Sequence, residues 1–310
     1  MNEKAKIVSV VIPFLNEKDN IPTLYERLCR VFKEQPENME IIFVDDGSTD
    51  GSPEWVERKA QDDPRIRLLR FSRNFGHQIA ITAGFDHAAG DAVIVMDADL
   101  QDPPEVIPAL LAKWRAGSEV VYAVRKSREG EGFIKKILAL SFYKVFRMMV
   151  KFNVPLNAGD FRLLDRPVVE ALKQMREAHR YMRAMTSWVG FSQCAVEYDR
   201  PARFAGETKY PAWQSLRLAI DGITSFSAAP LRWVSGFGVG VSMFGVLWLA
   251  NILWGKFQNP AGPVPGWTSV IAAVLIFSGV QMISIGLLGQ YISRIFEESK
   301  KRPLYILRKK

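Results

Sequence analysis

Short apolar runs rich in valine and isoleucine recur along the first 125 residues, separated by segments with helical periodicity. The runs are IVSVVIPF (7–14), EIIFVDD (40–46), RIRLLRFS (65–72), DAVIVMDAD (91–99) and EVVYAVR (119–125). Strands that alternate with helices in this way usually form parallel strands joined by crossover helices. The pattern therefore predicts an open α/β sheet, mostly parallel and of the Rossmann-like type, with helices on both faces.

Charged or amide side chains follow every one of these predicted strands. They are Asn16 and Glu17, Asp45 and Asp46, Arg73 and Asn74, Asp97 and Asp99, and Arg125. Ligands of such sheets bind outside the carboxyl ends of the strands. Helix capping accounts for some of these residues, but not for paired aspartates, an isolated arginine and Asp-Ala-Asp together. The sequence therefore predicts a polar binding site at that edge.

Two long stretches near the C-terminus, residues 234–255 and 257–293, carry no charged residue. Each contains an apolar core of about 20 residues, the length that a helix needs to cross a bilayer. We expect transmembrane helices at about 234–255 and 268–292, and the alternative is a pair of buried core helices. Aromatic residues suited to the membrane interface stand near the ends of both stretches: Trp233, Trp254, Trp267 and Tyr291.

Basic residues are distributed unevenly around these stretches. Only Lys256 lies in the connecting loop, whereas a basic tail, residues 294–310, follows the second stretch. The positive-inside rule therefore predicts an integral protein of the inner or plasma membrane with both termini in the cytoplasm. A formal net charge of +8 suits anionic lipid and would also suit nucleic acid. Because two spans are predicted, we favour the membrane and expect no nucleic-acid partner.

Two further segments have the character of interfacial helices. Residues 133–152 carry five basic and no acidic side chains among many apolar ones, as do helices that lie on anionic membrane surfaces. The alternative is an ordinary domain helix with a solvated basic face. Residues 212–232 are predicted to form a juxtamembrane interfacial helix that leads into the first span.

The aspartates after the fourth strand suggest metal chemistry. Asp97 and Asp99 are spaced so that both carboxylates can reach one hard divalent cation, Mg²⁺ or Mn²⁺, which would hold a diphosphate. A solvated acidic turn is the alternative, because Asp-x-Asp is a short pattern. Asp102 precedes Pro103 and Pro104, an arrangement that favours an N-cap. The chain has no GxGxxG or P-loop pattern, so neither a nicotinamide site nor a P-loop is indicated.

Five motifs in order resemble the inverting GT-A glycosyltransferases of family 2: VVIPFLNE, FVDDGSTDGS, MDADLQDPPE, GDFRLLDR and RFAGETKYP. They are most similar to the polyisoprenyl-phosphate glycosyltransferases, which include dolichyl-phosphate mannose synthase and bacterial undecaprenyl-phosphate glucosyltransferases. The resemblance covers nearly the whole chain. It implies a cytoplasmic GT-A domain at residues 1–211 and a two-helix transmembrane hairpin at residues 233–293.

The resemblance also implies roles for single residues. The nucleotide sugar would contact Pro13, Glu17, Asp45, Asp46, Asp97 and Gln101. The metal would be held by Asp97, Asp99 and Gln101. The acceptor phosphate would be bound by Arg125, Arg203 and Lys209. The residues closest to catalysis would be Asp99, Asp160 and Arg125. His77 stands near the acceptor in the family pattern, and an ordinary helix-start histidine is the alternative.

The implied reaction is transfer of a hexose from a nucleotide sugar to a polyisoprenyl phosphate. A phosphate monoester is largely a dianion at pH 7, so it needs no strong general base. Asp160 would then orient a basic residue or stabilise the charge that develops on the sugar. Direct attack on the anomeric carbon would invert its configuration. UDP-glucose and undecaprenyl phosphate are the first choices; GDP-mannose, a UDP-N-acetylhexosamine or a UDP-aminoarabinose derivative are alternative donors.

Two other functions and an oligomer remain open at this point. A processive polysaccharide synthase shares the acidic motifs, but the chain has no Gln-x-x-Arg-Trp motif and only two predicted spans. A non-catalytic membrane scaffold or nucleotide-sugar sensor would not need Asp97, Asp99, Arg125 and Lys209. Gly236, Gly238 and Gly240 would allow close helix packing within or between subunits, as in a homo-oligomer.

Overall fold

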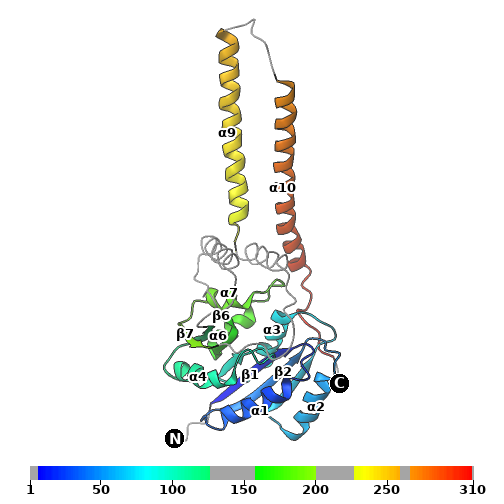
Figure 1. Cartoon of the computed structure of the whole chain (residues 1–310), viewed down its shortest axis with the longest axis vertical. Helices are drawn as coiled ribbons and strands as arrows, with labels where there is room; N and C mark the ends of the chain where they lie inside the picture. The colour runs from blue at the N-terminus through cyan, green and yellow to red at the C-terminus, as the bar shows by residue number, and fades with distance from the viewer. Residues whose placement is uncertain (1–5, 126–157, 200–226, 259–265, 309–310) are drawn as a thin grey trace. The chain divides into compact units, whose positions relative to one another are not determined.

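The computed structural model describes residues 6–125, 158–199, 227–258 and 266–308 (Figure 1). Two compact units divide the chain: residues 1–215 together with 302–310, and residues 216–301. The predicted interfacial helix at 133–152 lies outside the described residues, as do Arg203, Lys209 and most of the segment 212–232. These predictions therefore stay predictions.

A seven-stranded sheet forms the centre of the first unit, in the order β3-β2-β1-β4-β6-β5-β7. Its strands are β1 (Ile7–Phe14), β2 (Asn38–Asp45), β3 (Ile66–Arg70), β4 (Ala92–Val95), β5 (Val120–Arg125), β6 (Ala158–Asp165) and β7 (Gln193–Tyr198). The first five are the strands that the apolar runs predicted. Only β6 is antiparallel to its neighbours β4 and β5, so the predicted mostly parallel sheet is confirmed.

Helices flank this sheet, as the alternating pattern predicted (Figure 1). They are α1 (Ile21–Phe32), α2 (Ser52–Asp62), α3 (His77–His87), the 3₁₀ helix η1 (Pro104–Val106), α4 (Ile107–Arg115), α6 (Arg166–Gln174) and α7 (Met182–Trp188). In α1 the buried residues Ile21, Leu24 and Leu28 recur at helical spacing and pack against the β1 face that carries Val10 and Ile12. Burial of each such side chain is worth about 1.5–3 kcal/mol.

The opposite face of β1 is covered by α3 at very short range. A Cβ atom added to Gly84 of α3 would lie 2.1 Å from Cγ1 of Val11. Only glycine allows this approach without moving the helix or the strand. The close contact fixes α3, and therefore His77 at its first turn, against the central strand.

The C-terminal residues return to the sheet after the second unit. The Ser72 amide donates to the Ile306 carbonyl at 2.9 Å, and the Arg308 amide donates to the Arg70 carbonyl at 2.8 Å. Phe71 and Leu307 form an antiparallel bridge beside the β3 edge. The segment expected to be a basic tail therefore continues the preceding helix to Ser299 and then packs on the first unit.

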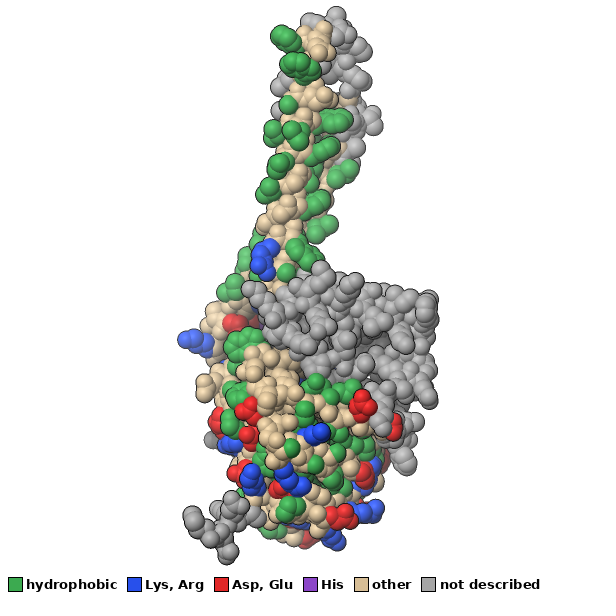
Figure 2. Space-filling view, turned by 90° about the vertical axis from the view of Figure 1, so that its left-hand side faces the viewer, with side chains coloured by type: hydrophobic (Ala, Val, Ile, Leu, Met, Phe, Trp, Pro, Cys, Tyr) green, Lys and Arg blue, Asp and Glu red, His purple; other side chains and the backbone are tan. Residues whose placement is uncertain are grey.

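Two long helices, α9 (Ala229–Gln258) and α10 (Trp267–Ser299), make up the described part of the second unit. Each is long and apolar enough to cross a membrane, in the windows Ala229–Trp248 and Ile276–Ser299. Apart from Ala229 at the start of the first window, which is 7% exposed, the residues of these windows are not buried in the described part of the chain. Figure 2 shows hydrophobic side chains along these helices. They are therefore not core helices of this chain, and both extend beyond the predicted spans 234–255 and 268–292.

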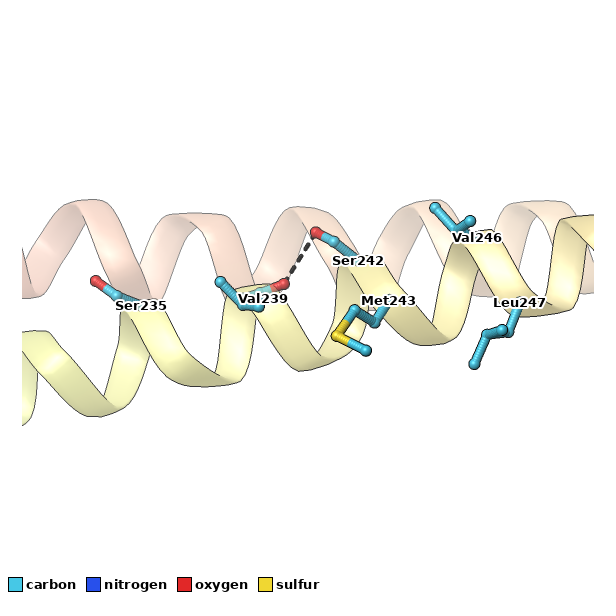
Figure 3. A pocket seen from close by; sticks show the side chains of 7 residues that line it. Ser235, Val239, Ser242, Met243, Val246 and Leu247 are labelled. Carbon is cyan, nitrogen blue, oxygen red and sulfur yellow. Dashed lines mark hydrogen bonds between the residues drawn. The ribbon is translucent and has the colours of Figure 1, made fainter.

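A shallow hollow runs along α9 between Ser235 and Leu247 (Figure 3). Its lining is apolar except for two serines, of which Ser242 donates its hydroxyl to the Gly238 carbonyl at 2.9 Å. It carries no charged group that could hold a diphosphate. A Cβ atom at Gly236, Gly238 or Gly240 would meet nothing within 4 Å, so these glycines make no close helix contact inside the described chain.

Candidate active site

The antiparallel strand β6 adds a further polar residue, Asp160, to the sheet edge at which the parallel strands end. The register pairs Ala92 with Asp165 and Val95 with Arg162, so each step forward along β4 matches one step back along β6. Continued by two residues, this register sets Asp97 opposite Asp160. The two carboxylates are 63 residues apart in the sequence, and strand pairing brings them to one place.

His77 stands between these two aspartates. Its Nε2 atom lies 3.5 Å from Asp97 Oδ1 and 3.4 Å from Asp160 Oδ2. Burial disfavours the imidazolium, but the hydrogen bond to Asp160 and the charges of both aspartates outweigh it and raise the pKa of His77. The structure therefore places His77 within the polar site, which the helix-start alternative did not require.

Arg183, in α7, holds Asp160 from the other side. Its Nε donates to Oδ1 at 2.9 Å and its Nη2 donates to Oδ2 at 3.3 Å. The Gln78 amide also donates to Oδ2, at 3.4 Å, while its Oε1 accepts the Met182 amide at 2.8 Å. Asp160 is only 7% exposed, so these donors replace the water that the carboxylate lost.

The protonation of Asp160 follows from these neighbours. Burial alone would favour the neutral acid, but the charge of Arg183 and the hydrogen bonds from His77 and Arg183 hold the pKa of Asp160 well below its usual range. Asp160 is therefore a carboxylate at neutral pH whose two oxygens are both occupied. Such a group orients its neighbours better than it accepts a proton.

Asp97 has an oxygen with no donor. Although 35% of its side chain is exposed, Oδ1 itself is buried and accepts no hydrogen bond. Burial raises the pKa of Asp97 to about 7; Asp102, Asp160 and Asp99 add to the rise and His77 opposes it. His77 lies 3.5 Å from this oxygen but makes no hydrogen bond to it, and a buried carboxylate oxygen without a hydrogen bond is costly. This oxygen is therefore suited to receive a cation.

The turn after Asp97 is held in an unusual backbone conformation. Leu100 has φ 60°, a left-handed value that costs a branched residue about 1–3 kcal/mol and often marks a functional turn. The turn lets the Gln101 amide donate to Asp99 Oδ1 at 3.1 Å, with Gln101 itself 8% exposed. Asp99 is thereby fixed on the same loop as Asp97.

The loop that carries Asp97 and Asp99 could supply some of the ligands of the metal that the resemblance implies, with substrate phosphates supplying others. Among the described residues, no three His, Cys, Asp or Glu side chains gather as a complete metal site. Mg²⁺ and Mn²⁺ are commonly held by one or two carboxylates, with phosphates and water filling the other positions. The Asp97 oxygen that accepts no hydrogen bond, with Asp99 two residues away, suits that arrangement. Asp97, Asp99 and Gln101 remain predicted ligands.

Asp102 does not cap the following helix, which corrects the prediction from its position before two prolines. The N-cap of η1 is Pro103, and no side chain caps it. Asp102 is 2% exposed and accepts the Tyr198 hydroxyl at 2.9 Å through Oδ1, while its Oδ2 lies 3.5 Å from the Asp97 amide. The Asp102 carboxylate therefore joins the Asp97 loop to Tyr198 at the end of β7. Tyr198 is 96 residues further along the chain, so residue spacing near Asp102 could not predict this contact.

The paired aspartates after β2 are both buried and serve different neighbours. Asp45 Oδ1 accepts the Ser48 amide at 2.7 Å, and Oδ2 lies 3.4 Å from Arg70 Nε. Asp46 accepts the amides of Phe75 at 2.7 Å and Gly76 at 3.0 Å. Burial raises the pKa of both carboxyls. In this structure the pair ties the β2 turn to the loop after β3.

The other predicted nucleotide contacts lie beside this turn. Pro13 is buried in β1, and Glu17, at the start of the following loop, accepts the Asn20 side-chain amide at 2.6 Å. The Arg125 backbone pairs with Tyr198 at the end of β5. The contacts of these three residues with substrate stay predictions, as do those of Arg203 and Lys209.

Sequence reasoning missed Arg183, Gln78 and Arg162 as members of the site. Arg162 is 4% exposed, and burial lowers its pKa to about 10; it donates to the Gly159 carbonyl at 2.7 Å and to the Thr186 hydroxyl. It belongs to the motif GDFRLLDR, so a signal was present. Arg183 belongs to no motif used in the sequence analysis, and only the fold brings it to Asp160.

The comparison with protein families identifies the class of this protein. The model described as "Glycosyl transferase family 2" matches residues 9–173, which is more than half of the chain. The chain therefore belongs to glycosyl transferase family 2 and is a glycosyltransferase. The resemblance drawn from the motifs, and the predicted GT-A type of sheet with two apolar C-terminal helices, are both confirmed.

Individual relatives cover almost the entire chain. "Uncharacterized glycosyltransferase YkcC" of Bacillus subtilis is 48% identical over 97% of this chain and 93% of its own length. "Bactoprenol glucosyl transferase" of Shigella phage SfV is 43% identical over 97% of this chain and 98% of its own length. The prophage bactoprenol glucosyl transferase homolog of Escherichia coli K12 is 42% identical, with the same coverages. These are similarities along full-length chains.

Proposed function

We propose that this glycosyltransferase moves one hexose from a nucleotide sugar to a polyisoprenyl phosphate, with UDP-glucose as donor and undecaprenyl phosphate as acceptor. Relatives named bactoprenol glucosyl transferase, at 41–43% identity over 97% of the chain, support a polyisoprenyl acceptor and glucose. The exposed apolar helices α9 and α10 agree with a lipid substrate.

The observation that carries the proposal is that Arg183 already donates a hydrogen bond to each oxygen of Asp160. A hydroxyl acceptor needs a base to remove its proton, whereas a phosphate monoester is largely a dianion at pH 7 and can attack directly. Both Asp160 oxygens already accept hydrogen bonds. The site therefore suits an acceptor that arrives deprotonated.

In the proposed reaction an oxygen of the lipid phosphate attacks the anomeric carbon of the donor. The new carbon–oxygen bond forms as the bond to the nucleotide diphosphate breaks, and the electron pair leaves with the diphosphate. Attack from the opposite side inverts the anomeric configuration. Asp160, with Arg183 and His77 around it, holds the edge of the sheet in one arrangement so that the two substrates meet in line.

A divalent cation on Asp97 and Asp99 would neutralise the charge that develops on the leaving diphosphate. The chain's own contribution is the fixed turn at Leu100, which aims both carboxylates from one loop. Gln101 would complete the same loop. Arg125, Arg203 and Lys209 are proposed to hold the acceptor phosphate, because arginine and lysine lower the repulsion between two anionic substrates.

The direct test uses the purified full-length protein with Mg²⁺ or Mn²⁺ and undecaprenyl phosphate. The donors are labelled UDP-glucose, GDP-mannose, UDP-N-acetylglucosamine and a UDP-aminoarabinose derivative. We expect one lipid-linked product, formed from UDP-glucose, with inverted anomeric configuration by NMR. No lipid-linked product from any donor would contradict the proposal.

The same experiment separates two alternatives. A product with several sugars on each lipid would identify a processive polysaccharide synthase. Nucleotide binding without transfer to any acceptor would favour a nucleotide-sugar sensor, a function that membership of a glycosyltransferase family makes the weaker alternative.

A further inference from the structure

The C-terminal residues Tyr305–Arg308, here named the C-terminal clamp, pack beside the loop that follows β3. Two backbone hydrogen bonds join them to that region, from Ser72 to Ile306 at 2.9 Å and from Arg308 to Arg70 at 2.8 Å. The clamp therefore extends the exposed edge of β3 and holds the start of the loop, residues 71–76.

Aromatic rings carry this contact into the loop. Tyr305 stacks on Phe71 with ring centroids 5.3 Å apart and an interplanar angle of 20°. Phe71 in turn meets the Phe75 ring edge to face at 5.5 Å. The Tyr305 hydroxyl donates to Asp86 Oδ2 at 2.9 Å, which anchors the clamp to α3. Aromatic pairs of this geometry contribute beyond simple burial.

The far end of the loop lies against the predicted nucleotide site. The amides of Phe75 and Gly76 donate to the Asp46 carboxylate at 2.7 and 3.0 Å. A Cβ atom at Gly47 would lie 2.9 Å from the Asn74 amide nitrogen, so the loop also packs tightly on the β2 turn. The next residue, His77, reaches Asp97 and Asp160. The loop 71–76 therefore links the clamp both to the β2 turn at Asp46 and Gly47 and, through His77, to Asp97 and Asp160.

We propose that the C-terminal clamp positions the donor side of the active site, with Tyr305 as its principal positioning residue. The clamp holds residues 71–76 against Asp46 and Gly47, so the nucleotide-binding edge is formed before substrate arrives. In the chain, only residues 300–304 separate the clamp from the apolar helix α10. The inference deepens the proposed function, on which it rests for the identity of the donor.

Tyr305→Ala removes the stacked ring and the hydroxyl, whereas Tyr305→Phe removes the hydroxyl alone. A loop that is ordered for a smaller fraction of the time binds nucleotide more weakly in proportion. We expect Tyr305→Ala to raise the Kd for nucleotide and the KM for donor about tenfold, with kcat within about twofold. We expect Tyr305→Phe to retain most of the wild-type affinity, because the stack remains.

Tyr25→Ala is the matched control. Tyr25 also packs edge to face with a ring, that of Trp55 at 6.0 Å, and donates its hydroxyl to an aspartate, Asp63, at 2.8 Å. It lies on α1, and its ring and hydroxyl contacts among the described residues are with Trp55, Asp63 and Lys59 rather than with the loop 71–76. We expect its nucleotide affinity to match the wild type. Thermal unfolding of all three variants shows that each is folded.

The measurements are calorimetric titration of the full-length chain with UDP and with GDP, in the presence of Mn²⁺, and amide hydrogen exchange. We expect faster exchange at residues 72–77 in Tyr305→Ala, but not in Tyr25→Ala. Unchanged exchange at residues 72–77 would overturn the proposal, and so would unchanged nucleotide affinity in Tyr305→Ala. Exchange needs no substrate, so failure of sugar transfer in the wild type would reject the proposed function and leave this test valid.

Discussion

Asp97, His77, Asp160 and Arg183 alternate in charge across the edge between β4 and β6. Each carboxylate faces a basic side chain: His77 lies between Asp97 and Asp160, and Arg183 donates to Asp160. Asp97 Oδ1, 3.5 Å from His77, nevertheless accepts no hydrogen bond. Buried like charges are tolerated only with such compensation. At the scale of single residues, the site is therefore nearly neutral, with one oxygen prepared for a cation.

Asp99→Asn tests the predicted metal role. The amide keeps the size of the side chain but removes its charge, so we expect transfer to fall by at least about 100-fold. Chelation by EDTA is expected to abolish wild-type transfer, and added Mg²⁺ or Mn²⁺ to restore it. Asp62→Asn, at an exposed position at the end of α2, is the control. Full activity in Asp99→Asn would refute a role in metal binding.

Arg183→Gln and Arg183→Lys test the orientation of Asp160. Glutamine removes the charge from beside a buried carboxylate, a loss worth about 1–3 kcal/mol, so kcat should fall about 10- to 100-fold. Lysine restores the charge but not the two-pronged geometry and should recover part of the rate. The exposed Arg58→Gln provides the comparison. If Arg183→Gln matched Arg58→Gln in steady-state kinetics, the orienting role would be lost.

At the scale of elements, polar side chains stabilise the short connections between helices and strands. The connection between α2 and β3 is an example: Asp63 accepts hydrogen bonds from the Arg65 side chain at 2.7 Å and from the Tyr25 hydroxyl at 2.8 Å. The hydrogen bond from Arg65 is the main reason that the pKa of Asp63 lies well below its usual range. The carboxylate therefore stabilises the fold in its ionised form.

The stability supplied by Asp63 should depend on pH. A lowered folded-state pKa adds stability that is complete above the unfolded-state value, about 3.9, and is lost as pH falls below it. At pH 7 we expect Asp63→Asn to lower the unfolding temperature by about 2–4 °C, because Arg65 is half exposed and screened. The difference from wild type should shrink between about pH 5 and pH 3. Asp62→Asn should show neither effect in tryptophan-fluorescence melts.

At the scale of the whole molecule, the chain joins a catalytic unit to an apolar hairpin and then returns to the catalytic unit. The clamp belongs to the same compact unit as the sheet. If α9 and α10 cross a membrane, both chain ends must therefore lie on the side where the catalytic unit lies. This agrees with the topology predicted from the basic residues, which remains a proposal.

Cysteine labelling checks that topology. In a variant with Cys29 and Cys194 replaced, a single cysteine at position 260, between α9 and α10 in the sequence, should react with an impermeant maleimide in intact cells. A single cysteine at the exposed position Asp62 should react only after the cells are opened. Labelling of both positions, or only of Asp62, in intact cells would reverse the predicted orientation.

The sequence by itself determined the parts of this protein that local pattern controls. Short continuous apolar runs specified β1 to β5, and long charge-free stretches specified α9 and α10, because burial and lipid select for hydrophobicity directly. The Asp97 loop was located because parallel strands all end at one edge. The motifs then specified the glycosyltransferase family, which the family comparison confirmed.

Tertiary structure alone decided which distant residues meet. The antiparallel insertion of β6 brings Asp160 to Asp97, and α7 then brings Arg183 to Asp160. Asp102 pairs with Tyr198 rather than capping a helix, and Tyr305 closes on Phe71 across more than 200 residues of chain. Hydrophobic patterning records whether a side chain is buried, but not which side chain it faces. Strand pairing and packing supply that second fact.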